Sequence, residues 1–84
     1  MEKEVGRVFV YYGNIGVAAI KLSDKLKVGD QIAIRGHTTD FKQKVESIQI
    51  EHNKVNEAKK WDEIGIKVRD KVRPNDVVYI VSPK

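Results

Sequence analysis

The 84-residue chain contains no cysteine, which excludes disulfide bonds, cysteine-ligated zinc and thiol nucleophiles. It has no run that approaches the ~20 apolar residues of a membrane-spanning helix, so we expect no membrane partner. Its first residues, Met1 to Glu4, are polar and largely charged, unlike those of a signal peptide. These absences lead us to expect a cytoplasmic protein.

The sequence also lacks the patterns that carry chemistry. No glycine-rich loop ends in Gly-Lys-Ser or Gly-Lys-Thr, so we expect no nucleotide binding by this chain alone. The two histidines, His37 and His52, have no carboxylate or third imidazole at metal-ligand spacing, and we expect neither a metal site nor a cofactor. The serines Ser23, Ser47 and Ser82 show no serine–histidine–aspartate arrangement. We therefore predict a protein that is not an enzyme.

Length and composition indicate one small folded domain over residues 1–84. The strands predicted below span about residues 5–81, where we expect the core. Hydrophobic residues make up 40% of the chain and charged residues 33%, with a net charge of +4. A positive charge favours encounters with polyanions such as RNA. The same charge is explained as well by a lysine-rich, solvated surface that binds no partner. The oligomeric state stays open.

The dominant period along the chain is two, which is typical of β-strands. Residues 5–12 carry large side chains on both faces, so their buried face stays open. Phe9, Tyr11 and Tyr12 could form a stacking platform there or divide between core and surface. The apolar phase changes near Glu46 and Ser47, which predicts a β-bulge within one long strand. Strands are predicted at residues 5–12, 17–22, 31–35, 41 to about 51, 63–69 and 77–81.

Residues 53–62 are the least strand-like part of the sequence. Val55 and Ala58 are three positions apart and two lysines follow, which fits one short helical turn or an irregular loop. The remaining strands and their glycine- and aspartate-containing turns predict a compact all-β protein.

Short motifs in a shared order resemble the second domain of translation GTPases. They are Leu26-Lys27-Val28-Gly29-Asp30, Val45-Glu46-Ser47-Ile48, and Glu57-Ala58 followed by Asp62 and Ile64-Gly65. The chain is similar here to the barrel of elongation factor Tu and of the initiation factor that carries initiator tRNA. The resemblance implies a small closed barrel of six or seven mostly antiparallel strands. It also implies a stand-alone, non-catalytic module that contacts RNA, either tRNA or the ribosome.

A second resemblance rests on Thr38-Thr39-Asp40-Phe41, Val45-Glu46-Ser47-Ile48-Gln49 and Ile64-Gly65-Ile66-Lys67-Val68. These stretches look like the C-terminal barrel of some collagenase-like peptidases, where the barrel is an accessory to a catalytic domain. The implied alternative function is a protein-interaction barrel that docks on a separate catalytic protein.

The chain departs from the translation factors where those proteins hold the aminoacyl end of tRNA. Gln49, His52 and Glu63 fall at those places and do not repeat the family's residues. The resemblance therefore does not imply capture of an aminoacyl group, while general contact with RNA, the ribosome or a protein stays open.

Two groups of residues are candidates for binding. The first is a basic row that could track phosphates, or that could be a solvated face protecting a strand edge. Trp61 is the second candidate, because an exposed tryptophan beside lysines could stack on a base or anchor a protein partner. The indole could equally close one mouth of the barrel as a plug. The basic row consists of Lys67, Arg69, Lys71 and Arg73, with Lys42 and Lys44 as a shorter companion.

Overall fold

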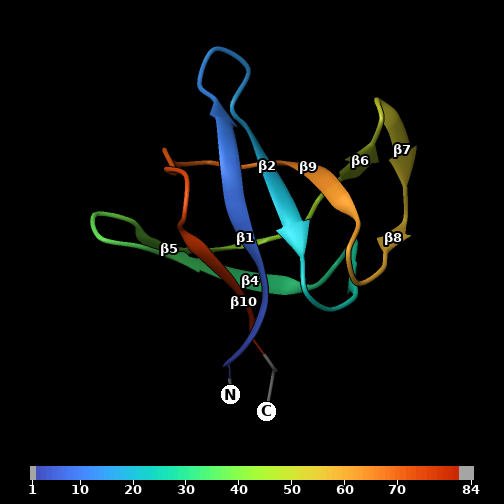
Figure 1. Cartoon of the computed structure of the whole chain (residues 1–84), viewed down its shortest axis with the longest axis horizontal. Coiled ribbons are helices and arrows are strands. Elements are labelled where there is room, and N and C mark those ends of the chain that lie inside the picture. The colour runs from blue at the N-terminus through green and yellow to red at the C-terminus, as the bar shows by residue number, and fades with distance from the viewer. Residues whose placement is uncertain (1, 82–84) are drawn as a thin grey trace.

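The computed structural model describes residues 2–81, and within them the chain forms β-strands and turns without a helix (Figure 1). Accordingly, these residues include no helix long and apolar enough to cross a membrane. The strands are β1 (Glu2–Tyr12), β2 (Val17–Leu22), β3 (Leu26–Lys27), β4 (Gln31–Arg35), β5 (Asp40–Lys44), β6 (Ile48–Ile50), β7 (Asn53–Val55), β8 (Glu57–Ala58), β9 (Glu63–Lys67) and β10 (Val77–Val81).

All strand pairs are antiparallel, as the resemblances imply, but the sheet does not close into a barrel. Eight strands follow the order β5-β4-β10-β1-β2-β9-β6-β7, and β3 pairs only with β8. The sheet curls around the core and ends at β5 and β7 (Figure 1). The expectation of an all-β protein is therefore confirmed, whereas a closed barrel of six or seven strands is not what the strand pairing shows.

The break in the barrel lies where β5 leads into β6. Here the backbone of Val45 bonds to the turn after β3, since Gly29 N donates to Val45 O and Val45 N donates to Asp30 O, both at 2.8 Å. These two bonds replace a strand ladder. The predicted single strand from residue 41 to about 51 with a β-bulge is wrong, because β5 and β6 are separate strands that pair with different neighbours.

Residues 53–62 also differ from their prediction. They contain the strands β7 and β8 instead of a helical turn. The backbone of β7 pairs with β6, and β8 pairs with β3, so tertiary pairing decides their conformation over a weak local pattern.

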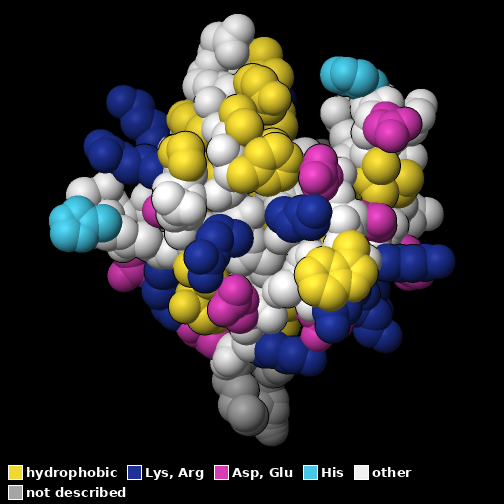
Figure 2. All heavy atoms as spheres, in the orientation of Figure 1, with side chains coloured by type: hydrophobic (Ala, Val, Ile, Leu, Met, Phe, Trp, Pro, Cys, Tyr) yellow, Lys and Arg dark blue, Asp and Glu magenta, His cyan; other side chains and the backbone are white. Residues whose placement is uncertain are grey.

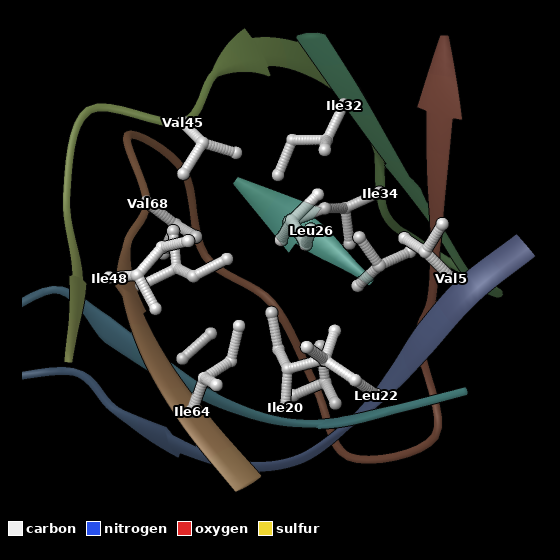
Figure 3. Packing of buried hydrophobic residues seen from close by; sticks show 14 of the residues in the cluster. Val5, Ile20, Leu22, Leu26, Ile32, Ile34, Val45, Ile48, Ile64 and Val68 are labelled. Carbon is white, nitrogen blue, oxygen red and sulfur yellow. The ribbon is translucent and has the colours of Figure 1, made fainter. Parts of the chain in front are cut away.

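Side chains from opposite parts of the curled sheet meet in one hydrophobic core (Figure 3). Ile20 and Leu22 of β2 point inward with Ile32 and Ile34 of β4, while Lys21 of β2 is exposed. The same alternation holds for Ile64, Ile66 and Val68 at β9, as predicted. Burial of these branched side chains supplies the main driving force for folding.

Two shifts in the pairing register decide which side chains of strand β1 are buried. The pairing register shifts between Glu4 and Gly6 and again between Val8 and Val10. As a result the inward positions of β1 are three residues apart: Val5 and Val8 are buried and Tyr11 packs against the core. A β-bulge adds one residue to one strand and re-aims the side chains that follow. Phe9 and Tyr12 are thereby left on the outer surface.

Candidate functional site

A groove of about 740 Å³ crosses the outer face of β2 and β9, and we call it the outer groove. Its floor consists of small side chains, because Ala19 of β2 lies opposite Gly65 of β9 in the strand pairing and Val17 lies beside them. A Cβ atom added at Gly65 would stand 3.4 Å from the Val17 side chain, an ordinary contact. The depth of the groove therefore depends on small residues at positions that face the solvent.

One wall of the outer groove is formed by β1 and the turn that follows it. Phe9, Tyr12 and Ile15 all line the groove, and Ile15 is 57% exposed. Figure 2 shows hydrophobic side chains gathered over this end of β1 and the β1–β2 turn. Exposed apolar side chains are normal singly, whereas several together mark a surface that can bind another molecule.

The opposite wall is the turn between β6 and β7. Gln49 and Ile50 of β6 line the groove, followed by Glu51 and His52. Glu51 and His52 both have left-handed backbone conformations, with φ of 51° and 69°. Because Ile50 pairs with Asn53, these two residues form a two-residue hairpin turn, and such turns require positive φ at both central positions. The pairing of β6 with β7 therefore fixes this wall of the groove.

Trp61 stands at the end of the outer groove. It is 67% exposed, so the interpretation of its indole as a plug in the barrel mouth is wrong. Its φ is 78°, and its N–H donates to Leu22 O at 3.0 Å. The turn is fixed further because Lys59 N donates to the Asp62 carboxylate at 2.8 Å. The fold therefore holds a large aromatic side chain in solvent on a strained backbone.

The charge of the outer groove differs from that of the whole chain. Among the described residues that line it are the carboxylates Glu51, Asp62 and Glu63, and neither lysine nor arginine. Two cations stand nearby: Lys21 Nζ lies 3.5 Å from Glu63 Oε2, and Lys60 Nζ lies 5.0 Å from the centre of the Trp61 ring. The Lys21 pair is exposed, so solvent screens it strongly.

The basic row lies on another part of the surface, and its residues are exposed. Strand β9 ends at Lys67, so Arg69, Lys71 and Arg73 belong to the following loop and not to a longer strand. Lys44, Lys67 and Arg69 line one shallow hollow, with the Gln43 side chain between them. Gln43 Nε2 donates to Lys67 O at 2.8 Å and Arg69 N donates to Gln43 Oε1 at 2.9 Å. Lys42 points outward on β5 like Lys44.

The remaining candidates for chemistry are dispersed. Within residues 2–81, no three side chains of histidine, cysteine, aspartate or glutamate gather as a metal site would require. His52 belongs to the outer groove and His37 to the turn between β4 and β5, and Figure 2 shows the two histidines on opposite sides of the molecule. Among residues 2–81, no side-chain hydrogen bond joins Ser23 or Ser47 to either histidine, and Ser82 falls outside the described residues.

Sequence reasoning found parts of the outer groove but not the groove itself. Gln49, His52 and Glu63, three positions that were aligned with the aminoacyl pocket of translation factors, do line it together. Phe9 and Ile15 were missed as groove residues. The available signal was the presence of large side chains on both faces of residues 5–12, which leaves some of them without a place in the core.

Comparisons with known proteins now bear on the two resemblances. No family model matches the chain. An uncharacterized protease of Methanocaldococcus jannaschii is 43% identical over 80 residues, which is 94% of this chain and 20% of that protein. A collagenase of Porphyromonas gingivalis is 43% identical over 77 residues, covering 89% of this chain and 21% of the collagenase. The chain is similar in sequence to a segment of these peptidases. It spans about a fifth of the length of these curated relatives.

Solved structures give the same fold. The C-terminal domain of a putative U32 peptidase from Geobacillus thermoleovorans matches with a TM-score of 0.90 at 22% identity, over 95% of this chain and 93% of that domain. The selenomethionine variant of that domain gives a TM-score of 0.86 at 23% identity, over 90% of this chain and 96% of the domain.

These matches correct the first functional expectation. The relatives are peptidases and collagenases, so the assignment to the translation-factor family is wrong, and with it the prediction of a module that contacts tRNA or the ribosome. The second resemblance, to the C-terminal barrel of collagenase-like peptidases, is supported. The motif at residues 26–30 misled because it encodes a turn: Gly29 has a φ of 100°, and Asp30 accepts a hydrogen bond from Lys27 N.

Proposed function

We propose that the chain is a non-catalytic accessory domain of collagenase-type peptidases and that it contacts their catalytic region. One observation carries this proposal. Identity of 43% extends over 94% of this chain, yet the chain corresponds to only 20% of the protease of Methanocaldococcus jannaschii. The other four-fifths of such a protein has room for a catalytic domain, whereas this segment is a small β fold.

The chemistry of the described residues supports an accessory role. The two histidines lie apart, and the three carboxylates of the outer groove are not arranged as a metal site. The groove instead offers exposed aromatic side chains, which are enriched where proteins recognise other proteins. An accessory domain needs such a contact surface and does not need reacting groups.

A titration tests the proposal. The purified chain is added to the Porphyromonas gingivalis collagenase from which the similar segment has been deleted, and binding is followed by calorimetry. We expect saturable binding, and cleavage of a labelled gelatin substrate by the truncated relative should change when the chain is present. The chain alone should leave gelatin intact. Absence of binding to the truncated relative, or cleavage by the chain alone, would overturn the proposal.

A further inference from the structure

The outer groove is an apolar surface that the described part of the chain leaves uncovered. Phe9, Tyr12, Ile15 and Trp61 are all exposed along it, although small domains have little apolar surface to spare for solvent. Its size falls within the range of ~300–1,000 Å³ typical of ligand sites. Exposure of this kind indicates a partner that covers the apolar side chains.

The backbone of the groove is fixed in place. Glu51, His52 and Trp61 have positive φ values and all three line the groove. Glu51 and His52 are the two central residues of the hairpin turn between paired Ile50 and Asn53, a turn type that requires positive φ at both, and the backbone N–H of Trp61 donates to Leu22 O. Backbone pairing therefore holds both turns in place, which accords with a preformed binding surface.

Charge decides which partner fits. Three other hollows of the surface each contain lysine or arginine in their lining, for example Lys25 in one and Arg7 in another. Carboxylates occur in those hollows too, but the described lining of the outer groove contains three carboxylates and neither lysine nor arginine, so its carboxylates are not balanced by cations of the same lining. Glu51 takes part in none of the ion pairs found among residues 2–81. A phosphate backbone would be repelled here, while a cationic segment would be attracted.

We infer that the outer groove binds a polypeptide segment in which an aromatic or aliphatic side chain is flanked by lysine or arginine. The apolar side chain lies on the floor of Ala19 and Gly65, between the β1–β2 turn and Trp61. The flanking cations face Glu51 and Glu63. This inference rests on the proposed function, because it assigns the segment to the catalytic region of the peptidase.

The chain has a built-in reporter for the test, since Trp61 is its single tryptophan. The probe is a short capped peptide with one phenylalanine flanked on each side by lysine, and its match has glutamate in place of lysine. We expect the lysine peptide to shift Trp61 emission to shorter wavelength as the indole leaves water. The glutamate peptide should bind at least about tenfold more weakly, and binding of the lysine peptide should weaken as salt rises.

Variants separate recognition from folding. Reversing charge with Glu51→Lys and Glu63→Lys together should invert the preference, so that the glutamate peptide binds more tightly than the lysine peptide. Loss of folding cannot produce such an inversion. Ile15→Ser should weaken both peptides. Val28→Ser is the matched control, because Val28 is also exposed, at 38%, but does not line the groove.

Three outcomes would overturn the inference. The first is equal binding of both peptides by the unmodified chain, and the second is no inversion of the preference with the double charge reversal. The third is self-association: if sedimentation shows a dimer that Ile15→Ser dissociates and that excludes the peptide, the groove is an interface between copies of this chain.

Failure of this inference can be told apart from failure of the proposed function. If the charge-reversed variant still binds the truncated peptidase as tightly as the unmodified chain, the accessory role stands and the groove is not its contact. If the chain binds the lysine peptide with the stated preference but never binds the truncated peptidase, the specificity of the groove stands. The assignment of the bound segment to the catalytic region of the peptidase then fails.

Discussion

The two ends of strand β9 belong to surfaces of opposite character. Glu63 and Gly65 contribute to the outer groove, which is apolar with carboxylates, whereas Lys67 begins the basic row. The groove side has an exposed tryptophan on a strained turn, and the basic side has a loop bonded to β5 through Gln43. The net charge of +4 describes neither surface. A partner is therefore better inferred from the local lining of a groove than from the composition of the chain.

The largest expected effect concerns the loop that carries the basic row. A Cβ atom added at Gly36 would overlap Asp76 Oδ1, while Asp76 Oδ2 accepts a hydrogen bond from Arg73 N at 2.8 Å. Because Asp76 is 4% exposed, its carboxylate has little room to move. We expect Gly36→Ala to lower the free energy of unfolding by about 1–3 kcal/mol, measured by urea denaturation.

The matched variant on the groove side is Gly65→Ala. Its new Cβ meets Val17 at an ordinary distance of 3.4 Å, so the free energy of unfolding should change by less than about 0.5 kcal/mol. Equal destabilisation by Gly36→Ala and Gly65→Ala would contradict the role of Asp76 as the side chain that holds the loop of the basic row in place.

Gln43→Ala should have the next largest effect. It removes both bonds between the Gln43 side chain and the backbone of Lys67 and Arg69, so the loop after β9 is released from β5. We expect a loss of about 1 kcal/mol and faster hydrogen exchange at the Arg69 amide. Gln49→Ala is the control, since the Gln49 side chain makes none of the hydrogen bonds found within residues 2–81. Unchanged exchange at Arg69 would contradict the bridging role.

Trp61→Gly tests whether the groove side carries strain. Glycine adopts a φ of 78° readily, and the largely exposed indole loses little packing, so we expect stability to rise by about 0.5–1 kcal/mol. Urea denaturation followed by circular dichroism measures the free energy of unfolding, because the substitution removes the fluorophore. Asn75→Gly, at a φ of 79°, should gain less because asparagine already tolerates that region. A destabilised Trp61→Gly would indicate that the indole supports the fold.

Local patterns were enough to predict much of this fold. Strands β2, β4 and β10 coincide with their predicted ranges, because alternation bounded by turn residues is a local property of the sequence. Strand β1 was located correctly apart from its first residues, but its buried face could not be assigned. Two register shifts make its inward positions recur every three residues, and nothing in the local sequence marks where they occur.

The outer groove could not be predicted in the same way. Ile15 and His52 lie on two hairpins far apart in the sequence, and only the curling of the sheet across β2 and β9 brings them to one groove. Trp61 likewise has a positive φ that no local pattern predicted, and its backbone N–H donates to Leu22 O, which lies far from it in the sequence. The closed barrel failed as a prediction because backbone bonds between Val45 and the turn after β3 replace a ladder.

The smallest effect concerns a charged cluster that belongs to neither surface. Arg35 donates to Glu2 Oε2 at 2.8 Å and to Asp40 Oδ1 at 3.1 Å, and it lies 5.8 Å from the centre of the Tyr79 ring. The hydrogen bond from Arg35 lowers the pKa of Glu2 below its ordinary value of 4.5. A lowered carboxyl pKa adds stability that is present at neutral pH and is lost as pH falls below about 4.5.

Arg35→Gln should therefore be slightly less stable than the unmodified chain at pH 7, with a difference that shrinks below pH 4.5 as Glu2 is protonated. Thermal unfolding across this pH range measures the difference. Arg7→Gln, whose guanidinium lies 3.9 Å from Glu4, is the matched surface variant and should show a smaller change. A difference that stays constant with pH would assign the role of Arg35 to its stacking on Tyr79, since that contact persists when Glu2 is neutral. In either case binding of the lysine peptide should be unchanged, because Arg35 does not line the outer groove.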